Sequence, residues 1–215
     1  MKSLTYPPVL AEQVDFSFLY HLVPSLMRIS IDFSQEININ EDILRIYVNK
    51  VVPAICDPGD DSQYGSSALC DIACLQALSR RIHIGKFVAE SKFMVEPEKF
   101  TALVKARDIE GINGFLTNEV VEDRVVHRAR LKAVAFGQDA FSDADAGFKV
   151  DPGVIAKLYR DMVIPMTKQV QVRYLFERVG GVDPPLDDEW PLSLLGYSNY
   201  QASPSEVAKR AANWM

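Results

Sequence analysis

The chain has 215 residues, of which 48% are apolar and 24% are charged, and this composition is typical of globular proteins rather than disordered or fibrous ones. Its length suits one domain with a substantial core. The net charge of −6 argues against an extended nucleic-acid surface, because binding to phosphates needs a basic face. A local cationic pocket remains compatible with this charge.

Cysteine content and apolar runs favour a reducing compartment and no membrane span. The three cysteines, Cys56, Cys70 and Cys74, are too few and too closely spaced for a disulfide framework. No apolar run reaches the ~18 residues that a membrane span needs, and the nearest, residues 16–27, contains a histidine and a proline. We therefore expect a cytoplasmic protein with no nucleic-acid or membrane partner.

The first predicted helix follows a segment, residues 1–36, that has no sustained period. Residues 40–55 carry apolar side chains at three- and four-residue spacing, and Asn40 is predicted to cap this helix. Pro53 should end or kink it, because proline lacks an N–H and its ring clashes with the preceding turn.

A long helix is predicted next. Residues 56–66 are rich in turn formers and precede a helix start at Ser66 or Ser67. The pattern then continues to Phe93 without a proline, which is about 27 residues or about 40 Å. A helix of this length needs partners along it, so we expect a helical bundle, which two chains could share.

Helical patterns continue to residue 179. They cover residues 96–106, 108–116, 117–137 and 151–179, with Asp151 as a cap, Pro152 in the first turn and a bend at Pro165. No segment outside them alternates convincingly with a period of two. Residues 180–215, rich in proline, serine and aspartate, are interpreted as a C-terminal extension with a short final helix.

Two cations on the long predicted helix are candidate ligand-binding residues. Arg81 and Lys92 return to within about 20° of one helical face, about 16 Å apart along the axis. Gly85 and Val88 lie between them and are expected to leave a gap that suits a compact dianion. The alternative is that both cations reach solvent, as Arg80, Lys86 and Glu90 are expected to do.

Two polar pairs have four-residue spacing, Asn118 with Glu122 and Thr167 with Gln171, and each directs two hydrogen-bonding groups the same way. A solvated polar face or a helix cap is the alternative for each pair.

Familiar catalytic motifs are absent from the sequence. Cys70 and Cys74 also share a face, but no histidine is near enough in sequence to suggest zinc, and His83 and His127 are expected to be structural. The chain has no GxSxG, HExxH, CxxC or phosphate-cradling glycine motif. These absences argue against hydrolases, kinases and redox enzymes of familiar signature.

The run "GSSALCDIACLQALSRRIHIGKFVAESKF", residues 65–93, closely resembles the long helix of the eukaryotic all-helical chorismate mutases. The similarity continues through "FLTNEVVEDRV" (115–125) and "LYRDMVIPMTKQVQVRYLFERV" (158–179). It covers roughly residues 37–179, which we interpret as the mutase-like domain. The fold it implies is an all-α bundle of the chorismate mutase II type, incomplete at the N-terminus, because the family's first long helix has no counterpart before "YPPVL".

This resemblance implies the rearrangement of chorismate to prephenate in phenylalanine and tyrosine biosynthesis, usually in a homodimer and without a metal or cofactor. By matching motifs, Arg81 would grip a substrate carboxylate, Lys92 a carboxylate and the ether oxygen, and Gln171 would donate to the ether oxygen. Asn118 and Glu122 would hold the ring side with its hydroxyl, and Thr167 would support carboxylate binding. Since an amide donates at any pH, Gln171 predicts activity without an acid requirement.

Gly65 and Ser66 match the family's effector site, so aromatic amino acids are candidate effectors. The arginine pair that accompanies this site in regulated members, and the substrate-binding arginine of the first helix, have no counterpart here. A second hypothesis is therefore a catalytically impaired helical subunit that dimerises with a complete mutase.

Overall fold

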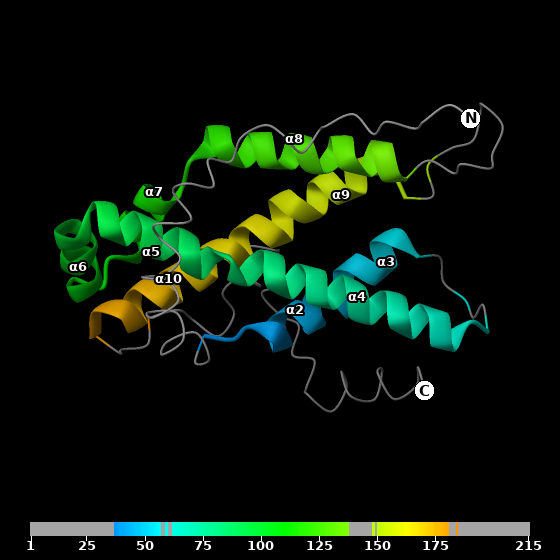
Figure 1. The fold of residues 1–215 in the computed structure, drawn as a ribbon, viewed down its shortest axis with the longest axis horizontal. Helices are drawn as coiled ribbons and strands as arrows, with labels where there is room; N and C mark the ends of the chain where they lie inside the picture. The colour runs from blue at the N-terminus through cyan, green and yellow to red at the C-terminus, as the bar shows by residue number, and fades with distance from the viewer. Residues whose placement is uncertain are drawn as a thin grey trace, which may run out of the picture.

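The computed structural model describes residues 37–56, 59, 62–137, 148, 150–180 and 184, and within this part of the chain all regular structure is helical (Figure 1). The predicted all-α fold is confirmed. The predicted N-terminal segment, residues 1–36, and the final helix predicted for the C-terminal extension lie outside the described residues. In chain order the helical segments are α2 (Asn40–Ile46), the π-helical turn η1 (Tyr47–Val51), α3 (Val52–Ile55), α4 (Tyr64–His83), α5 (Gly85–Val95), α6 (Pro97–Lys105), α7 (Ile109–Leu116), α8 (Glu119–Phe136), α9 (Pro152–Leu158), the π-helical turn η2 (Tyr159–Val163) and α10 (Ile164–Gly180).

The predicted long helix is in fact two helices, α4 and α5, separated by a turn at Ile84. Ile84 keeps right-handed dihedrals, φ −59° and ψ −17°, and its carbonyl accepts the Phe87 N–H at 3.1 Å, a bond of three-residue spacing. Because the backbone tightens here without reversing, α4 and α5 remain nearly collinear (Figure 1). The helix also begins at Tyr64, before the predicted serines, and ends at Val95.

Both helix-interior prolines follow a π-helical turn by two residues. Pro53 comes after η1 and Pro165 after η2. A wider turn relieves the clash between the proline ring and the carbonyl one turn earlier, so the helix continues past each proline. Of the two predicted effects of Pro53, ending the helix at that point is wrong, because the helix runs on to Ile55.

The predicted helix cap is confirmed for Asp151 at α9, and the predicted cap Asn40 at α2 is wrong. Asp151 Oδ1 accepts the Gly153 N–H at 2.8 Å, with Pro152 in the first turn, as predicted. Asn40 was predicted as a cap but is the first residue of α2, and its N–H donates to Asn38 Oδ1 at 2.9 Å. The Asn40 side chain instead accepts the Ser79 hydroxyl of α4 at 2.7 Å, a tertiary contact that local patterning does not reveal.

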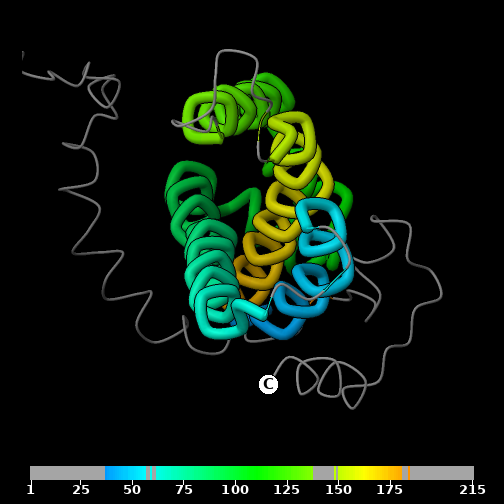
Figure 2. Tube along the Cα trace, turned by 90° about the vertical axis from the view of Figure 1, so that its right-hand side faces the viewer, coloured from blue at the N-terminus to red at the C-terminus, as the bar shows by residue number. Residues whose placement is uncertain are grey.

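Helix α10 is the central element of the bundle. It contacts α4, α5, α6 and α7, while α8 lies along α9 and α2 lies against α4 (Figures 1 and 2). Burial nearly all round α10 is the pattern of a core helix. Its buried residues are Met166, Gln169, Val170, Gln171, Val172, Tyr174, Leu175 and Phe176. No helix in the described ranges is both long and apolar enough to cross a bilayer.

Candidate active site

The contact at Gly85 brings α5 directly onto α10. A Cβ added at Gly85 would lie 2.7 Å from the carbonyl oxygen of Thr167 and 3.4 Å from Cγ of Gln171. The predicted gap between Arg81 and Lys92 is therefore wrong at Gly85, because the backbone of α10 fills it, while Val88 is 40% exposed. The close approach has a different use, since it holds Thr167 and Gln171 against the helix that carries Lys92.

Gln171 is only 6% exposed and presents an amide inside the bundle. Its Nε2 donates to the Thr167 carbonyl at 3.2 Å, which leaves a second N–H on the same nitrogen. Its Oε1 is buried and has no hydrogen-bond partner among the described residues. The Thr167 hydroxyl donates to the Val163 carbonyl at 2.6 Å. A buried amide with unused capacity is a natural place for a polar ligand atom.

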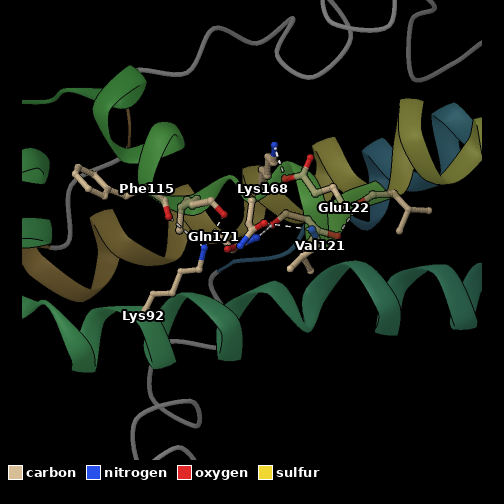
Figure 3. Close-up of polar contacts among 10 residues, drawn as sticks. Lys92, Phe115, Val121, Glu122, Lys168 and Gln171 are labelled. Carbon is tan, nitrogen blue, oxygen red and sulfur yellow. Dashed lines mark hydrogen bonds and ion pairs between the residues drawn. The ribbon is translucent and has the colours of Figure 1, made fainter. Parts of the chain in front are cut away.

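Lys92 reaches across from α5 to the C-terminal end of α7 (Figure 3). Its Nζ donates to the carbonyl of Leu116 at 2.6 Å and to that of Phe115 at 3.2 Å. The C-terminus of a helix carries partial negative charge, so this position beside the last carbonyls of α7 stabilises an ammonium. An ammonium has three donors, and two are used here, which leaves one for a ligand.

Lys168 and Glu122 complete the cluster from α10 and α8. Lys168 Nζ lies 2.8 Å from Glu122 Oε1, and Figure 3 shows this ion pair beside Gln171 and Lys92. The sequence interpretation missed Lys168. The available signal was its position three residues before Gln171, which places both side chains on neighbouring parts of one helix face.

Burial and neighbouring charges set the protonation of Lys92. Burial lowers the pKa of Lys92 below its usual value, the negative charge of Glu122 raises this pKa, and the positive charge of Lys168 lowers it further. The ammonium is therefore easier to deprotonate than that of a lysine in water. Its acidic neighbour Glu122 and its basic neighbour Lys168 shift its pKa in opposite directions.

This arrangement predicts the pH dependence of any activity that needs the Lys92 ammonium. Such activity should be complete below the lowered pKa of Lys92 and fall as pH rises through it. In Lys168→Met, loss of the repelling cation should raise this pKa and move the alkaline limb to higher pH; Glu122→Gln should move it to lower pH. Profiles of kcat/KM against pH report these shifts, since they follow the free enzyme. Identical alkaline limbs in all three proteins would show that another group titrates.

Arg81 lies on the same face of its helix as Gly85, one turn earlier, and is half-buried. Within the described part of the chain it has no hydrogen-bond or ion-pair partner, so the structure does not place it in the Lys92 cluster. The prediction that two nearby residues of this helix, Lys86 and Glu90, face solvent is wrong. Lys86 is 8% exposed and Glu90 is 1% exposed, because both turn toward the core rather than to water.

Asn118 occupies the cap that the sequence allowed as its alternative role. Its Oδ1 accepts the Val121 N–H at 3.2 Å at the start of α8, one turn before Glu122. The side chain is exposed, and the cap leaves its NH₂ group available to a ligand.

Capping and ligand binding by Asn118 can be separated by substitution. Asn118→Ala should lower the free energy of unfolding by about 1 kcal/mol, because a capping bond is lost. Asn118→Asp should keep the cap and its stability, yet weaken binding of an anionic substrate by repulsion. Thermal unfolding and KM measured on both variants distinguish the two roles, and an unchanged KM in Asn118→Asp would leave only the cap.

The predicted effector residues lie far from this cluster. Gly65 and Ser66 are exposed at the start of α4, and Ser66 Oγ donates to the Gln63 carbonyl at 3.1 Å. Sixteen residues of helix, or about 24 Å, separate Gly65 from Arg81. His83 is structural, as predicted: its Nε2 accepts the Ile39 N–H at 3.2 Å and its Nδ1 lies 2.9 Å from the Ser79 carbonyl.

The cluster therefore combines two cations, one carboxylate and an amide donor in a partly dehydrated setting. Among the residues that the structure describes, neither Lys92 nor Gln171 is hydrogen-bonded to a base as an activated nucleophile would be. Fixed donors of this kind hold an anion and stabilise negative charge that develops on an oxygen during a reaction.

The chain is similar to known proteins of one family. The pattern of the family described as chorismate mutase type II matches residues 63–172. The chain is 47% identical over 144 residues to the chorismate mutase of Schizosaccharomyces pombe, covering 66% of this chain and 57% of the relative. It is 39% identical over 176 residues to that of Saccharomyces cerevisiae, covering 80% of this chain and 67% of the relative.

Solved structures show the same similarity. The chorismate mutase Aro7p of Candida albicans, in complex with L-Trp, superposes with a TM-score of 0.65 at 43% identity, covering 70% of this chain and 57% of that one. AtCM1 with tyrosine bound in its allosteric site gives 0.60 at 42% identity, covering 66% and 56%. The chain spans little more than half the length of the first curated relatives it matches, 54–58%.

Proposed function

The chain belongs to the chorismate mutase type II family, and from this membership we propose that it rearranges chorismate to prephenate, a step toward phenylalanine and tyrosine. The observation that supports this most is the convergence of Lys92, Lys168 and Gln171 beside Glu122. We assign this activity to residues 37–179 as one helical domain.

The chemistry fits the groups present. The rearrangement is intramolecular, so it needs neither a nucleophile nor a metal or cofactor from the protein. The flexible dianion must be held in a compact shape, and negative charge that grows on the breaking ether oxygen must meet fixed donors. We propose that the third N–H of Lys92 and the free N–H of Gln171 supply these donors.

The other predicted residues take supporting roles in the proposal. Arg81 binds a substrate carboxylate, and Asn118 and Glu122 hold the ring hydroxyl. Thr167 supports the carboxylate when its hydroxyl turns from the Val163 carbonyl toward the substrate. Two observations support this role for Arg81: it shares a helix face with Gly85, and its donors have no partner among the described residues.

A direct assay of the purified chain tests the proposal. Loss of chorismate and appearance of prephenate should be seen, and Arg81→Ala should reduce the rate strongly while leaving thermal unfolding unchanged. A folded chain without activity would reject the proposal and favour the alternative, a non-catalytic subunit that needs a complete mutase.

We further propose a cytoplasmic homodimer. Exposed apolar side chains along α4, namely Tyr64, Leu69 and Ile72, offer a surface for a second copy, and all three cysteines are free thiols, as in a reducing compartment. The mass in solution, measured by light scattering, tests the dimer.

Aromatic amino acids are proposed as effectors at Gly65 and Ser66, by analogy with the relatives that bind L-Trp or tyrosine. Gly65 and Ser66 lie in the first turn of α4, where the partial positive charge of a helix N-terminus favours a carboxylate. Kinetics that do not change with added tryptophan or tyrosine would remove this part of the proposal.

A further inference from the structure

Glu90 is a buried carboxylate that the proposed mechanism does not use. It lies on α5, two residues before Lys92, and is 1% exposed. A buried charge is unfavourable unless it is paired and hydrogen-bonded, and a well-packed apolar side chain in its place is often as stable or more so. Glu90 therefore calls for a reason other than stability.

All polar partners that the structure shows for Glu90 lie on α10. Its Oε2 accepts the Tyr174 hydroxyl at 2.7 Å and lies 3.3 Å from Nε of Arg178. The Arg178 guanidinium also lies over the Phe93 ring of α5, 4.9 Å from its centroid. Burial, then the hydrogen bond to Glu90, raises the pKa of the Tyr174 hydroxyl well above its usual range, so this proton stays in place.

These contacts join the two helices that carry the site. On α10, Tyr174 follows Gln171 by three residues, less than one turn, and α5 and α10 make the most extensive helix contact in the described chain. At the other end of the contact, Gly85 meets the Thr167 carbonyl. Packing of a glycine against backbone brings helices close but is not directional. The hydrogen bonds of Glu90 to Tyr174 at 2.7 Å and to Arg178 at 3.3 Å are directional, so they limit sliding and rolling of the helices.

We propose that Glu90 is a positioning residue, which fixes the register of α5 on α10 through Tyr174 and Arg178 and so sets the distance between the Lys92 ammonium and the Gln171 amide. The kinetic consequence rests on the proposed mutase activity, while the register itself does not. Glu90 touches no substrate in this proposal and acts only through Lys92 and Gln171.

The decisive variant is Glu90→Met with Tyr174→Phe. It removes the directional bonds, keeps similar volumes and leaves no buried hydroxyl without a partner, while Arg178 can turn to water. We expect an unfolding temperature equal to or above that of the native chain. We expect kcat to fall about tenfold with KM within threefold, since misplacement by 1 Å can cost about 10²-fold and the ground-state contacts remain.

Two matched variants separate positioning from general packing. Glu90→Gln keeps an acceptor for the Tyr174 hydroxyl, so kcat should stay within threefold of the native value. Leu175→Ala removes only apolar contact from the same helix and should lower the unfolding temperature with kcat within threefold. The proposal is overturned if the double variant folds and keeps its kcat, if its losses follow the pattern of Leu175→Ala, or if Glu90→Gln loses as much as the double variant.

Crystal structures of the native chain and the double variant distinguish this inference from the proposed function. A native chain that leaves chorismate unchanged rejects the mutase proposal alone. A shift of Gly85 relative to the Thr167 carbonyl in the double variant then supports the register role of Glu90, and an unshifted contact rejects it.

Discussion

Replacing Lys92 with methionine is expected to lower kcat by about 10²–10³-fold, the usual effect of removing one fixed donor to a developing oxyanion. Methionine keeps the apolar stem of the side chain but loses the ammonium that lies on the Phe115 and Leu116 carbonyls. Steady-state kinetics on chorismate measure the effect.

The control is Lys132→Met, which removes a cation from the exposed face of α8 and should leave kcat within about twofold. A Lys92→Met enzyme that folds and retains more than a tenth of the native kcat would show that the ammonium does not act in the transition state.

Replacing Gly85 with alanine is expected to damage both stability and rate. The new Cβ would lie 2.7 Å from the Thr167 carbonyl oxygen, which is backbone and cannot rotate away, so α5 and α10 must separate. Overpacking of this kind lowers the free energy of unfolding by about 1–3 kcal/mol. A displacement of about 1 Å between Lys92 and Gln171 would reduce kcat by about 10²-fold.

Gly114→Ala is the matched control for this change. Gly114 is also helical, in α7, but has no atom within 4 Å of an added Cβ. Alanine there should stabilise the chain by up to about 1 kcal/mol through helix propensity alone. Denaturant unfolding and kcat on both variants test the contrast, and a Gly85→Ala chain as stable as Gly114→Ala would refute the tight contact.

Local patterning was sufficient for most helices. Apolar spacing identified the helical segments, and a cap with a following proline identified the start of α9 at Asp151. Pro53 was predicted to end or kink its helix and Pro165 to bend its own, and the chain accommodates each with a wider turn. The reason is that a π-helical turn two residues before each proline relieves the clash of its ring, and periodicity alone does not reveal such a turn.

The site was only partly accessible from sequence. The family resemblance selected Lys92 and Gln171, and the structure brings them together with Glu122. Lys168 was missed, and Glu90 was assigned to solvent because its four-residue spacing from Lys86 suggested a surface pair. That rule concerns one helix in isolation and does not include the partner helix that covers it.

The helical class, the family and the residue types of the site could be predicted from the sequence, because they depend on local periodicity and on side-chain chemistry. Only the tertiary structure decided that Gly85 is a contact rather than a gap, and that Glu90 is buried against Tyr174. Both facts depend on the position of α10, whose Thr167 and Tyr174 lie more than 80 residues along the chain from the α5 residues they contact.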